Sequence, residues 1–492
     1  MIDRILQQLT YNPHEPLIFS SGLFLFLFLG FTFCYMLLQH TRTLRLLFVT
    51  AFSYYFYYKS SGFYFFLLAV VTLSDYLIAK AIAASPDPSK RRGRLLVALS
   101  LCIDLGLLGY FKYTNFFAGM WAQMVGANFQ PWDIFLPVGI SFFTFQSMSY
   151  VIDVYRGDLK PLPSLLDYAF YVSFFPQLVA GPIVRARDFA PQIRQPLHIT
   201  DEMFARGVFF IMIGLFKKAV ISDYISLNFV DRIFDNPSLY SGVENLLGAY
   251  GYAMQIYCDF SGYSDMAIGI ALLLGFRFPM NFNAPYTSQS ITDFWRRWHI
   301  SLSSWIRDYI YISMGGNRRG KVRQYVNLIV TMLLGGLWHG ASLNFVAWGG
   351  MHGVALAIHK WSREHLFHHD RHYQSRGWRR VAAVVLTFHF VVFCWIFFRN
   401  HTFQASWIMI GKIFTDFHPE LFLQVVEGYW AVFAMILLGY CTHFIPDRWC
   451  DATVSIIRRG GVLLAALLIA AVIYVVIQVK SSEIQPFIYF QF

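Results

Sequence analysis

This chain of 492 residues contains few charged residues and lacks the common motifs of soluble enzymes. Asp, Glu, Lys and Arg make up 14% of it, whereas soluble domains carry about 25%. An ordinary soluble globular protein is therefore excluded. The sequence also contains no GxSxG motif, no HExxH motif and no pair of catalytic carboxylates on a soluble face. A self-contained hydrolase of a known pattern is not expected.

The cysteines do not indicate a metal-binding site, because the six of them show no CxxC motif and no spacing typical of metal ligands. Most of them fall inside apolar runs and are expected to pack as small hydrophobic residues. Four histidines, His365, His368, His369 and His372, have spacings that could bind a metal, but a polar loop is their commoner setting. The sequence predicts neither a metal site nor a tightly bound cofactor.

Long apolar runs, by contrast, recur from residue 17 to residue 478, and 57% of the chain is hydrophobic. Runs of about 17 to 25 apolar residues are long enough to cross a bilayer as helices. We therefore predict an all-α, polytopic membrane protein with a single domain over 1–492, in which some runs are re-entrant or broken. The first run has no small-residue cleavage site and is expected to be a retained span. The candidate spans are 17–38, 46–58, 62–84, 95–112, 133–152, 164–182, 203–222, 243–275, 324–360, 380–398, 429–447 and 460–479.

The net charge of +11 could indicate nucleic-acid binding, but Lys and Arg occur in short clusters between apolar segments. That arrangement is typical of the cytoplasmic loops of membrane proteins. Arg42 and Arg45 precede the second candidate span, and a basic cluster at 90–94 follows the third. The positive-inside rule places both clusters in the cytoplasm, with the amino terminus and the turn at 59–62 outside.

Residues 290–310, SITDFWRRWHISLSSWIRDYI, are amphipathic at the period of a helix. Interleaved Trp and Arg suit a helix at the membrane interface, and the basic residues that follow place 290–323 on the cytoplasmic side. His299 lies at the edge of the apolar arc, either half buried toward a cavity or simply hydrogen-bonded at the interface. The arc contains Ile291, Trp295, Trp298, Leu302, Trp305 and Tyr309, and Arg296, Ile300 and Arg307 face away.

His339 follows the apolar run 324–338, within the segment 324–360. An ionisable side chain at such depth usually lines a cavity or a pathway, although a neutral histidine bonded to a backbone carbonyl is the alternative. Glycines at 335, 336 and 340 would let a backbone or a ligand approach the ring and would allow the helix to break. We interpret the segment as the wall of a tunnel.

Further polar groups lie near these histidines in the sequence. The stretch 257–269 places Asp259 and Asp265 inside an apolar span, where they either take part in a site or pair with an arginine of the cytoplasmic layer. The loop 314–320, MGGNRRG, could hold phosphates through its amides and arginines, or it could be a cytoplasmic turn. The segment 361–379 is the one clearly polar segment in the second half of the chain.

The stretches DFWRRWHISLSSWIRDYIYISMGGNRRG and TMLLGGLWHG together resemble the membrane-bound O-acyltransferase family, in the subgroup similar to the alginate O-acetylation membrane protein. The resemblance covers nearly the whole chain. Other matching stretches are LPVGISFFTFQSMSYVIDVYRG (136–157), FFPQLVAGPIVRARDF (174–189), GLFKKAVISDY (214–224), YCDFSGYSDMAIGIALLLGFRFPMNFNAPY (257–286) and the ending PFIYFQF.

The resemblance implies about 11 to 12 membrane segments around a central funnel, with re-entrant or interfacial helices. By motif, His339 of LWHG matches the catalytic histidine of the family, and His299 of RRWHIS matches the partner position. Acyl transfer from a thioester to a hydroxyl needs a base and no covalent nucleophile. His339 is expected to be that base in its neutral form, while His299 orients a substrate or stabilises the oxyanion.

An acyl thioester such as acetyl-CoA is the implied donor, and it would approach from the cytoplasm, where basic residues attract its phosphates. The implied location is the bacterial inner membrane. The residues expected to bind donor or acceptor are Trp295, Arg296, Arg297, Trp298, Arg307, Arg318, Arg319, Trp338, Asp259, Asp265 and Asn281.

The resemblance also implies periplasmic or extracellular partner proteins that complete acetyl transfer to alginate, a cellulose-like exopolysaccharide or peptidoglycan. The immediate acceptor is then either a sugar or a serine of a partner. Two other functions stay open. Enzymes that transfer D-alanine from a carrier-protein thioester to teichoic acid share the WH motifs, and a transporter or channel could use His339, Asp259 and Asp265 as a proton or solute path.

Overall fold

Helices form the regular structure of this protein in the computed structural model, which describes residues 7–13, 15–85, 91–367, 375–479 and 487–488. No strand occurs among these residues. The predicted all-α class is therefore confirmed. The helices fall into two compact units, unit 1 with Met1–Ile211 and Met266–Pro279, and unit 2 with Met212–Asp265 and Met280–Phe490.

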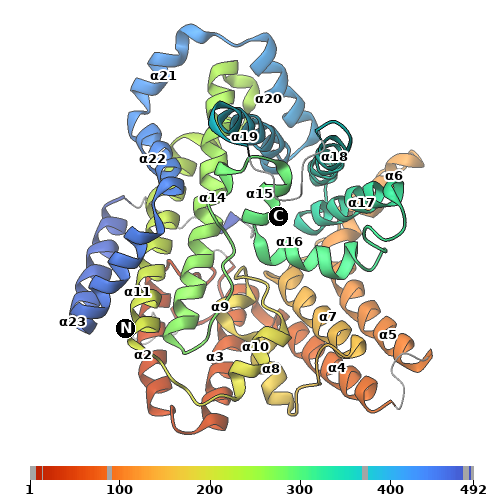
Figure 1. Cartoon of the computed structure of the whole chain (residues 1–492), viewed down its shortest axis with the longest axis vertical. Helices are drawn as coiled ribbons and strands as arrows, with labels where there is room; N and C mark the ends of the chain where they lie inside the picture. The colour runs from red at the N-terminus through yellow and green to blue at the C-terminus, as the bar shows by residue number, and fades with distance from the viewer. Residues whose placement is uncertain (1–6, 14, 86–90, 368–374, 480–486, 489–492) are drawn as a thin grey trace. The chain divides into compact units, whose positions relative to one another are not determined.

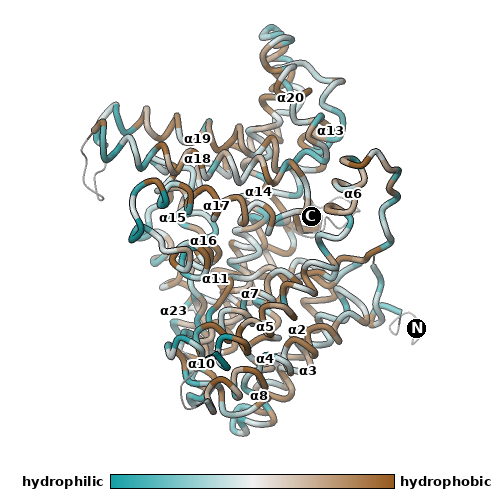
Figure 2. The backbone as a smooth tube through the Cα atoms, turned by 90° about the vertical axis from the view of Figure 1, so that its right-hand side faces the viewer, coloured by the Kyte–Doolittle hydropathy of each residue, from teal (hydrophilic) through white to brown (hydrophobic). Residues whose placement is uncertain are grey.

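Unit 1 is built from apolar helices whose buried faces are rich in phenylalanine. The ring of Phe31 in α2 lies 4.4 Å from that of Phe52 in α3 and 5.4 Å from that of Phe175 in α9. Much of α2, α3 and α5 is brown in the hydropathy view (Figure 2). The helices (Figure 1) are α2 (Gly22–Leu37), α3 (Arg42–Ser61), η1 (Gly62–Tyr64), α4 (Phe65–Ala83), α5 (Arg91–Leu108), η2 (Gly109–Tyr113), α6 (Thr114–Met124), α7 (Ile140–Arg156), α8 (Leu165–Ser173), α9 (Phe175–Leu178) and α10 (Ala186–Arg194).

Unit 2 holds the remaining helices, while α11 (Asp201–Leu215) and α14 (Gly242–Leu273) each contribute residues to both units. Its helices are η3 (Phe216–Ser222), α12 (Asp223–Ile225), η4 (Ser226–Val230), α13 (Asp231–Asp235), η5 (Pro237–Leu239), η6 (Pro285–Thr287), α15 (Ile291–Arg297), α16 (Ile300–Ile306), η7 (Arg307–Tyr311), α17 (Lys321–His339), α18 (Leu343–His365), α19 (Gly377–Arg399), α20 (Phe403–Thr415), η8 (Pro419–Leu421), α21 (Phe422–Gly428), α22 (Trp430–Cys441), η9 (Thr442–Phe444) and α23 (Asp447–Val479).

Four helical stretches in the described residues are long and apolar enough to cross a membrane, or five if one bent pair counts as a span. Several predicted spans are not continuous helices. The run at 133–152 is helical only from Ile140, and the run at 164–182 breaks after Ser173, where Phe174 has a non-helical ψ of 109°. The four stretches are Arg42–Ala83, Arg91–Met124, Gly377–Arg399 and Asp447–Val479, and the bent pair is Pro419–Gly428 with Trp430–Phe444.

The long apolar run at 324–360 is a hairpin of α17 and α18, joined by a turn at 340–342 (Figure 1). A Cβ on Gly336 would lie 2.2 Å from the carbonyl oxygen of Phe345, and one on Gly349 would lie 2.3 Å from that of Met332. Small residues therefore let the two backbones approach closely. The turn, with His339 beside it, forms one end of this hairpin.

The prediction of one continuous amphipathic helix over 290–310 is wrong. The segment forms two short helices, α15 and α16, followed by the π-helical turn η7. The break falls at Trp298 and His299. All six side chains of the predicted arc are nonetheless buried, and Arg296 and Arg307 are exposed, so the periodicity identified the correct buried face.

Candidate active site

His299 lies in the break between α15 and α16 and is fully buried, rather than half buried at a helix edge. Its φ of 43° is in the left-handed region, which costs of order 1–3 kcal/mol for a residue other than glycine. Asn281 compensates for this cost, because its backbone oxygen accepts the N–H of Ile300 at 3.0 Å. The Asn281 side-chain oxygen accepts the N–H and the hydroxyl of Ser301 at 3.2 and 2.9 Å.

The same Asn281 amide determines which nitrogen of His299 carries the proton. Nδ2 of Asn281 donates to the hydroxyl of Ser264 at 3.2 Å, so Oδ1 is the atom that faces His299, at 3.2 Å from its Nδ1. An amide oxygen can only accept a hydrogen bond. The neutral His299 ring therefore carries its hydrogen on Nδ1, and Nε2 is its basic nitrogen.

His339 is the last residue of α17 and is 3% exposed. The helix ends because Gly340 adopts an extended conformation, and a Cβ there would lie 2.0 Å from the ring of Phe345. The predicted helix break is thus present, and Phe345 of α18 is the group that approaches Gly340. A helix C-terminus stabilises positive charge, so the end of α17 lowers the cost of placing a positive charge on the His339 ring.

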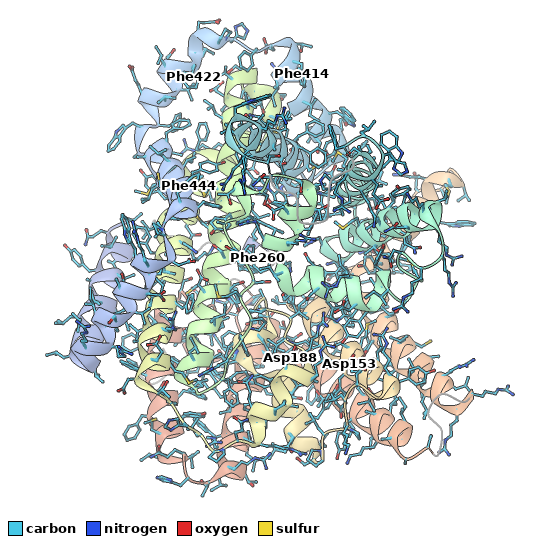
Figure 3. All side chains as sticks on the ribbon, in the orientation of Figure 1. Asp153, Asp188, Phe260, Phe414, Phe422 and Phe444 are labelled. Atoms are coloured by element: carbon cyan, nitrogen blue, oxygen red, sulfur yellow. The ribbon has the colours of Figure 1, made fainter. Side chains whose placement is uncertain are left out.

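The two histidines meet in an aromatic surrounding. Their ring centroids are 6.5 Å apart, and the Trp338 ring lies 5.0 Å from His339 and 6.0 Å from His299. Phe260 of α14, labelled in Figure 3, places its ring edge to face with His299 at 4.6 Å. The ring of Trp348 contacts His339 in the same edge-on manner at 5.1 Å. Two imidazoles from separate stretches of sequence are therefore neighbours in a largely apolar environment.

Trp295 is connected to this pair through α18. Its indole Nε1 donates to Nδ1 of His352 at 3.3 Å, and its ring lies 5.7 Å from that of Trp348. Trp348 in turn contacts His339. Sequence reasoning did not identify Trp348 or His352, although the apolar segment 343–360 contains two histidines, His352 and His359, which were a visible signal.

Trp298 belongs to an aromatic cluster beside the histidines. Its ring lies 5.0 Å from those of Phe282 and Trp395 and stacks on Phe294 at 5.6 Å. It is 1% exposed. These contacts give Trp298 a packing role next to His299.

Asp259 and Asp265 are both paired with lysines of unit 2. The Lys217 ammonium lies 2.8 Å from Asp265, and that of Lys218 lies 2.6 Å from Asp259. The π-helical turn η3 widens the helix locally, and both consecutive lysines bond to α14. Pairing with a cation was one of the two readings left open, but the partners are lysines and not arginines of the cytoplasmic layer. Asp259 also accepts the N–H of Ile488 at 2.9 Å, while the rest of the ending PFIYFQF, apart from Phe487, lies outside the described residues.

Two arginines predicted to bind the donor are paired within their own segment. Arg297 lies 3.0 Å from Asp293, and Arg307 lies 2.6 Å from Asp308. The hydrogen bond to Asp308 raises the pKa of the Arg307 guanidinium, so this side chain stays charged. Arg297 and Arg307 thus already have carboxylate partners.

The loop after η7 borders an open groove of about 600 Å³. Three cationic side chains, Arg319, Lys321 and Arg323, line it together with apolar residues of α17. Arg318 is exposed next to them, and Arg296 is exposed on α15. The full lining is Met314, Arg319, Gly320, Lys321, Val322, Arg323, Val326, Asn327 and Val330.

No group of three or more His, Cys, Asp or Glu side chains gathers as metal ligands in the part of the chain that the structure describes. His365 lies 3.0 Å from the carbonyl oxygen of Trp361 through its Nδ1. His368, His369 and His372 of the polar segment lie outside the described residues.

Comparison with known proteins places this chain in a family. A profile of the membrane-bound O-acyltransferase family matches residues 159–399. The chain is 43% identical over 406 residues to a probable alginate O-acetylase AlgI of Pseudomonas aeruginosa, covering 81% of this chain and 75% of that protein. It is 37% identical over 421 residues to a peptidoglycan O-acetyltransferase of Helicobacter pylori, covering 79% and 78%. It is 32% identical over 284 residues to a teichoic acid D-alanyltransferase of Bacillus subtilis, covering 54% and 69%. The chain belongs to the membrane-bound O-acyltransferase family and is a multi-pass membrane enzyme that transfers acyl groups to oxygen.

Proposed function

We propose that this enzyme takes an acetyl group from a cytoplasmic thioester, acetyl-CoA in the simplest case, and passes it across the bacterial inner membrane for O-acetylation of a polysaccharide. The observation that carries the proposal is the meeting of His299 and His339, whose buried rings lie 6.5 Å apart. The three relatives are named for acyl transfer to alginate, peptidoglycan and teichoic acid. Their names support a polymer outside the cytoplasm as the final acceptor.

His339 acts as the general base in this proposal. Its neutral ring takes the proton of the acceptor hydroxyl as the hydroxyl oxygen attacks the thioester carbonyl carbon. The tetrahedral intermediate then collapses, the carbon–sulfur bond breaks, and the imidazolium returns its proton to the leaving thiolate. The products are an O-acyl ester and a free thiol, with no net gain or loss of protons. The C-terminal end of α17 favours the imidazolium that forms transiently.

His299 acts as the partner group of the base. Its hydrogen faces Asn281, so it presents the basic Nε2 and can receive a hydrogen bond from the acceptor hydroxyl or from a donor amide. Asn281 is therefore assigned to orienting His299. Trp338, which contacts both rings, is assigned to holding the acyl group between them.

The donor is proposed to bind from the basic side of unit 2. Arg296, Arg318 and Arg319 are exposed, and Arg319 lines the groove with Lys321 and Arg323. Side chains of this kind attract phosphate groups of a nucleotide thioester. The buried pairs of Asp259 and Asp265 with lysines are assigned to fixing α14 behind the site.

The acceptor side is proposed to involve a partner protein in the periplasm or outside the cell. In that arrangement the acetyl group passes to a serine of the partner, which then acetylates alginate, a cellulose-like exopolysaccharide or peptidoglycan. Direct transfer to sugar is the other arrangement. Radiolabel on the partner in the absence of polysaccharide would distinguish the two.

Two other functions make different predictions. A D-alanyl transferase would use a carrier-protein thioester, and the alignment to such an enzyme covers 54% of this chain, against 81% for the alginate relative. A transporter would need ionisable groups exposed to a path, whereas Asp259 and Asp265 are held in ion pairs. Both observations favour acetyl transfer.

The test uses purified full-length protein in proteoliposomes with acetyl-CoA labelled in the acetyl group. Wild type is expected to transfer or slowly release acetyl, and His339→Ala is expected to lose at least about 100-fold in rate, as general-base removal does. His389→Ala is the matched control, because His389 is an exposed histidine of α19 bonded to a backbone oxygen. Undiminished acetyl transfer by His339→Ala would refute the base assignment, and solute movement without acyl chemistry would identify a transporter.

A further inference from the structure

Two buried hydrogen-bond donors of α18 stand next to the histidine pair without protein partners. Within the described part of the chain, Nε1 of Trp348 and Nε2 of His352 have no hydrogen-bond partner. Trp348 is 1% exposed and His352 is 0% exposed. Buried polar groups are nearly always hydrogen-bonded. Two orphaned groups one helical turn apart therefore require an explanation.

The protonation state of His352 follows from its one hydrogen bond. The indole N–H of Trp295 donates to Nδ1 of His352 at 3.3 Å, so Nδ1 carries a lone pair. The neutral ring then carries its hydrogen on Nε2. Both orphaned atoms, Nε2 of His352 and Nε1 of Trp348, are consequently N–H donors, and neither can accept.

The N–H donors of Trp348 and His352 lie close to His339, the proposed general base. The Trp348 ring centroid lies 5.1 Å from that of His339 and 4.8 Å from that of His352. The neighbouring rings, including Phe294 at 6.1 Å and Phe390 at 5.6 Å from His352, offer no acceptor oxygen. A ligand that satisfies the pair must therefore bring acceptor atoms and otherwise be apolar enough to enter this surrounding.

We propose that Trp348 and His352 bind the carbonyl oxygens of the acyl thioester arm and so align the thioester with His339. This inference rests on the proposed function. An acyl-pantetheine arm fits the requirement, because it is a narrow chain whose thioester and two amide carbonyls are all acceptors. Trp348 contacts His339 and is assigned to the thioester carbonyl. His352, one turn further along α18, is assigned to the next carbonyl of the arm.

A pair of isosteric substitutions separates this role from simple support of Trp295. Asparagine places a polar group near the position of histidine Nδ1, and glutamine places one near Nε2. His352→Gln keeps the donor toward the arm, and His352→Asn keeps only a partner for Trp295. We expect His352→Asn and Trp348→Phe to lower kcat/KM for acetyl-CoA about tenfold, as loss of a hydrogen bond to a buried group does. His352→Gln should stay within about threefold of wild type.

The opposite ranking would overturn the proposal. If His352 only supports Trp295, His352→Asn retains activity and His352→Gln loses it. Trp361→Phe serves as the matched control, because Trp361 lies on the same helix and is 45% exposed. The thermal midpoint of each variant in detergent is measured alongside, so that loss of folded protein is not taken for loss of donor binding.

A binding measurement tests the contact without turnover. S-acetonyl-CoA carries a ketone carbonyl one methylene beyond the sulfur, near the position of the acyl carbonyl, and S-propyl-CoA has the same chain length without a carbonyl. Wild type is expected to bind S-acetonyl-CoA about tenfold more tightly than S-propyl-CoA, and Trp348→Phe is expected to remove that preference. An unchanged preference in Trp348→Phe would mean that the orphaned donors hold only water, and the proposal fails. Failure of the proposed function is distinct, because it would appear as the absence of any acetyl transfer from acetyl-CoA by the wild-type protein.

Discussion

Nδ1 of His299 lies 3.2 Å from Oδ1 of Asn281, and this contact determines the tautomer of the histidine. The Asn281 oxygen also receives both donors of Ser301. A buried acceptor with three donors cannot be removed without leaving those donors unpaired. Asn281 therefore connects the backbone break between α15 and α16 to the chemistry of the ring.

The first prediction concerns Asn281→Ala. We expect a loss of stability of about 1–3 kcal/mol, because buried donors of His299 and Ser301 lose their acceptor. Acetyl transfer should fall at least about tenfold, because the His299 ring is no longer held in the Nδ1–H form. Asn283→Ala is the control, since its side chain is exposed and its hydrogen bonds to Arg297 are made by its backbone. Equal activity of the two variants would contradict the role of Asn281.

The sequence was sufficient to predict the buried face of 290–310 and not the break within it. Trp295, Trp298 and Trp305 recur at helical spacing, and burial follows that spacing even when the helix is interrupted. The break at His299 depends on hydrogen bonds to Asn281, a tertiary contact that no local pattern contains. Periodicity reports which side chains are apolar, whereas chain breaks depend on distant partners.

The same distinction applies to the other site residues. The glycines before and after His339 predicted a helix end, but Gly336 and Gly340 are needed because Phe345 of the following helix lies against them. Asp259 and Asp265 were expected either to take part in a site or to pair with an arginine. That the cations are Lys217 and Lys218 depends on the π-helical turn η3, since a regular helix turns consecutive side chains to different faces.

The second prediction compares two adjacent glycines of α17. A Cβ on Gly336 would lie 2.2 Å from the backbone oxygen of Phe345, which cannot move without separating α17 from α18. Gly336→Ala should therefore lose about 1–3 kcal/mol of stability through overpacking. Gly335→Ala should be neutral or stabilising by up to about 1 kcal/mol, because its Cβ would meet only Ile306 at 3.7 Å and alanine favours a helix. Thermal unfolding in detergent measures both, and equal midpoints would contradict the hairpin contact.

The third prediction concerns the buried ion pair of Lys218. Its ammonium lies 2.6 Å from Asp259 and 2.7 Å from Asp223. Lys218→Met leaves the buried carboxylate of Asp259 without its lysine and removes the lysine that pairs with the partly buried Asp223, which should cost about 3–5 kcal/mol. Adding Asp259→Asn should restore part of the loss, since the neutral amide removes one of the uncompensated charges.

The control for Lys218→Met is Arg206→Ala. Arg206 pairs with Glu202 at 2.6 Å, but both side chains are 42% exposed, and such helical surface pairs contribute only about 0.3–0.5 kcal/mol. Unfolding of each variant is followed by circular dichroism against denaturant. Similar losses of unfolding free energy in Lys218→Met and Arg206→Ala would contradict the prediction, because the buried pair would then contribute no more than the exposed one.

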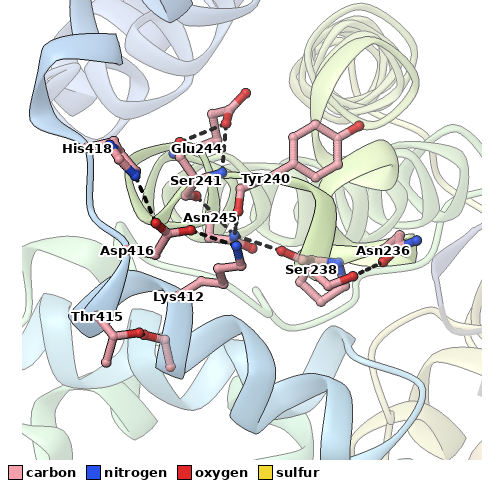
Figure 4. A network of polar contacts seen from close by, with 12 residues as sticks. Asn236, Ser238, Tyr240, Ser241, Glu244, Asn245, Lys412, Thr415, Asp416 and His418 are labelled. Carbon is pink, nitrogen blue, oxygen red and sulfur yellow. Dashed lines mark hydrogen bonds and ion pairs between the residues drawn. The ribbon is translucent and has the colours of Figure 1, made fainter.

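The fourth prediction concerns pH and the loop that follows α20, shown in Figure 4. His418 lies 2.8 Å from both Glu420 and Asp416, and Asp416 also binds Lys412 at 2.6 Å. Hydrogen bonding to Glu420, and then to Asp416, raises the pKa of His418 above 6.5. Lys412 chiefly lowers the pKa of Asp416, and a backbone hydrogen bond together with His418 lowers that of Glu420.

The sign of the effect follows from these directions. The raised pKa of His418 means that its contribution is complete below pH 6.5 and is lost as pH rises through the folded value. The lowered pKa values of the two carboxyls mean that their contribution is complete above pH 4.5 and is lost on acidification. The loop should therefore be held most firmly between about pH 4.5 and 6.5.

The amides of Gly242 and Val243 report on this loop, because they donate to the carbonyl oxygens of Asp416 and Phe417 at 2.7 and 2.9 Å. Their hydrogen-exchange protection, corrected for intrinsic rates, should be greater at about pH 6 than at about pH 8. His418→Gln should flatten this difference, and the exposed His365→Gln on α18 should leave it unchanged. A pH dependence in His418→Gln equal to that of wild type would contradict the prediction and would assign the change to another group.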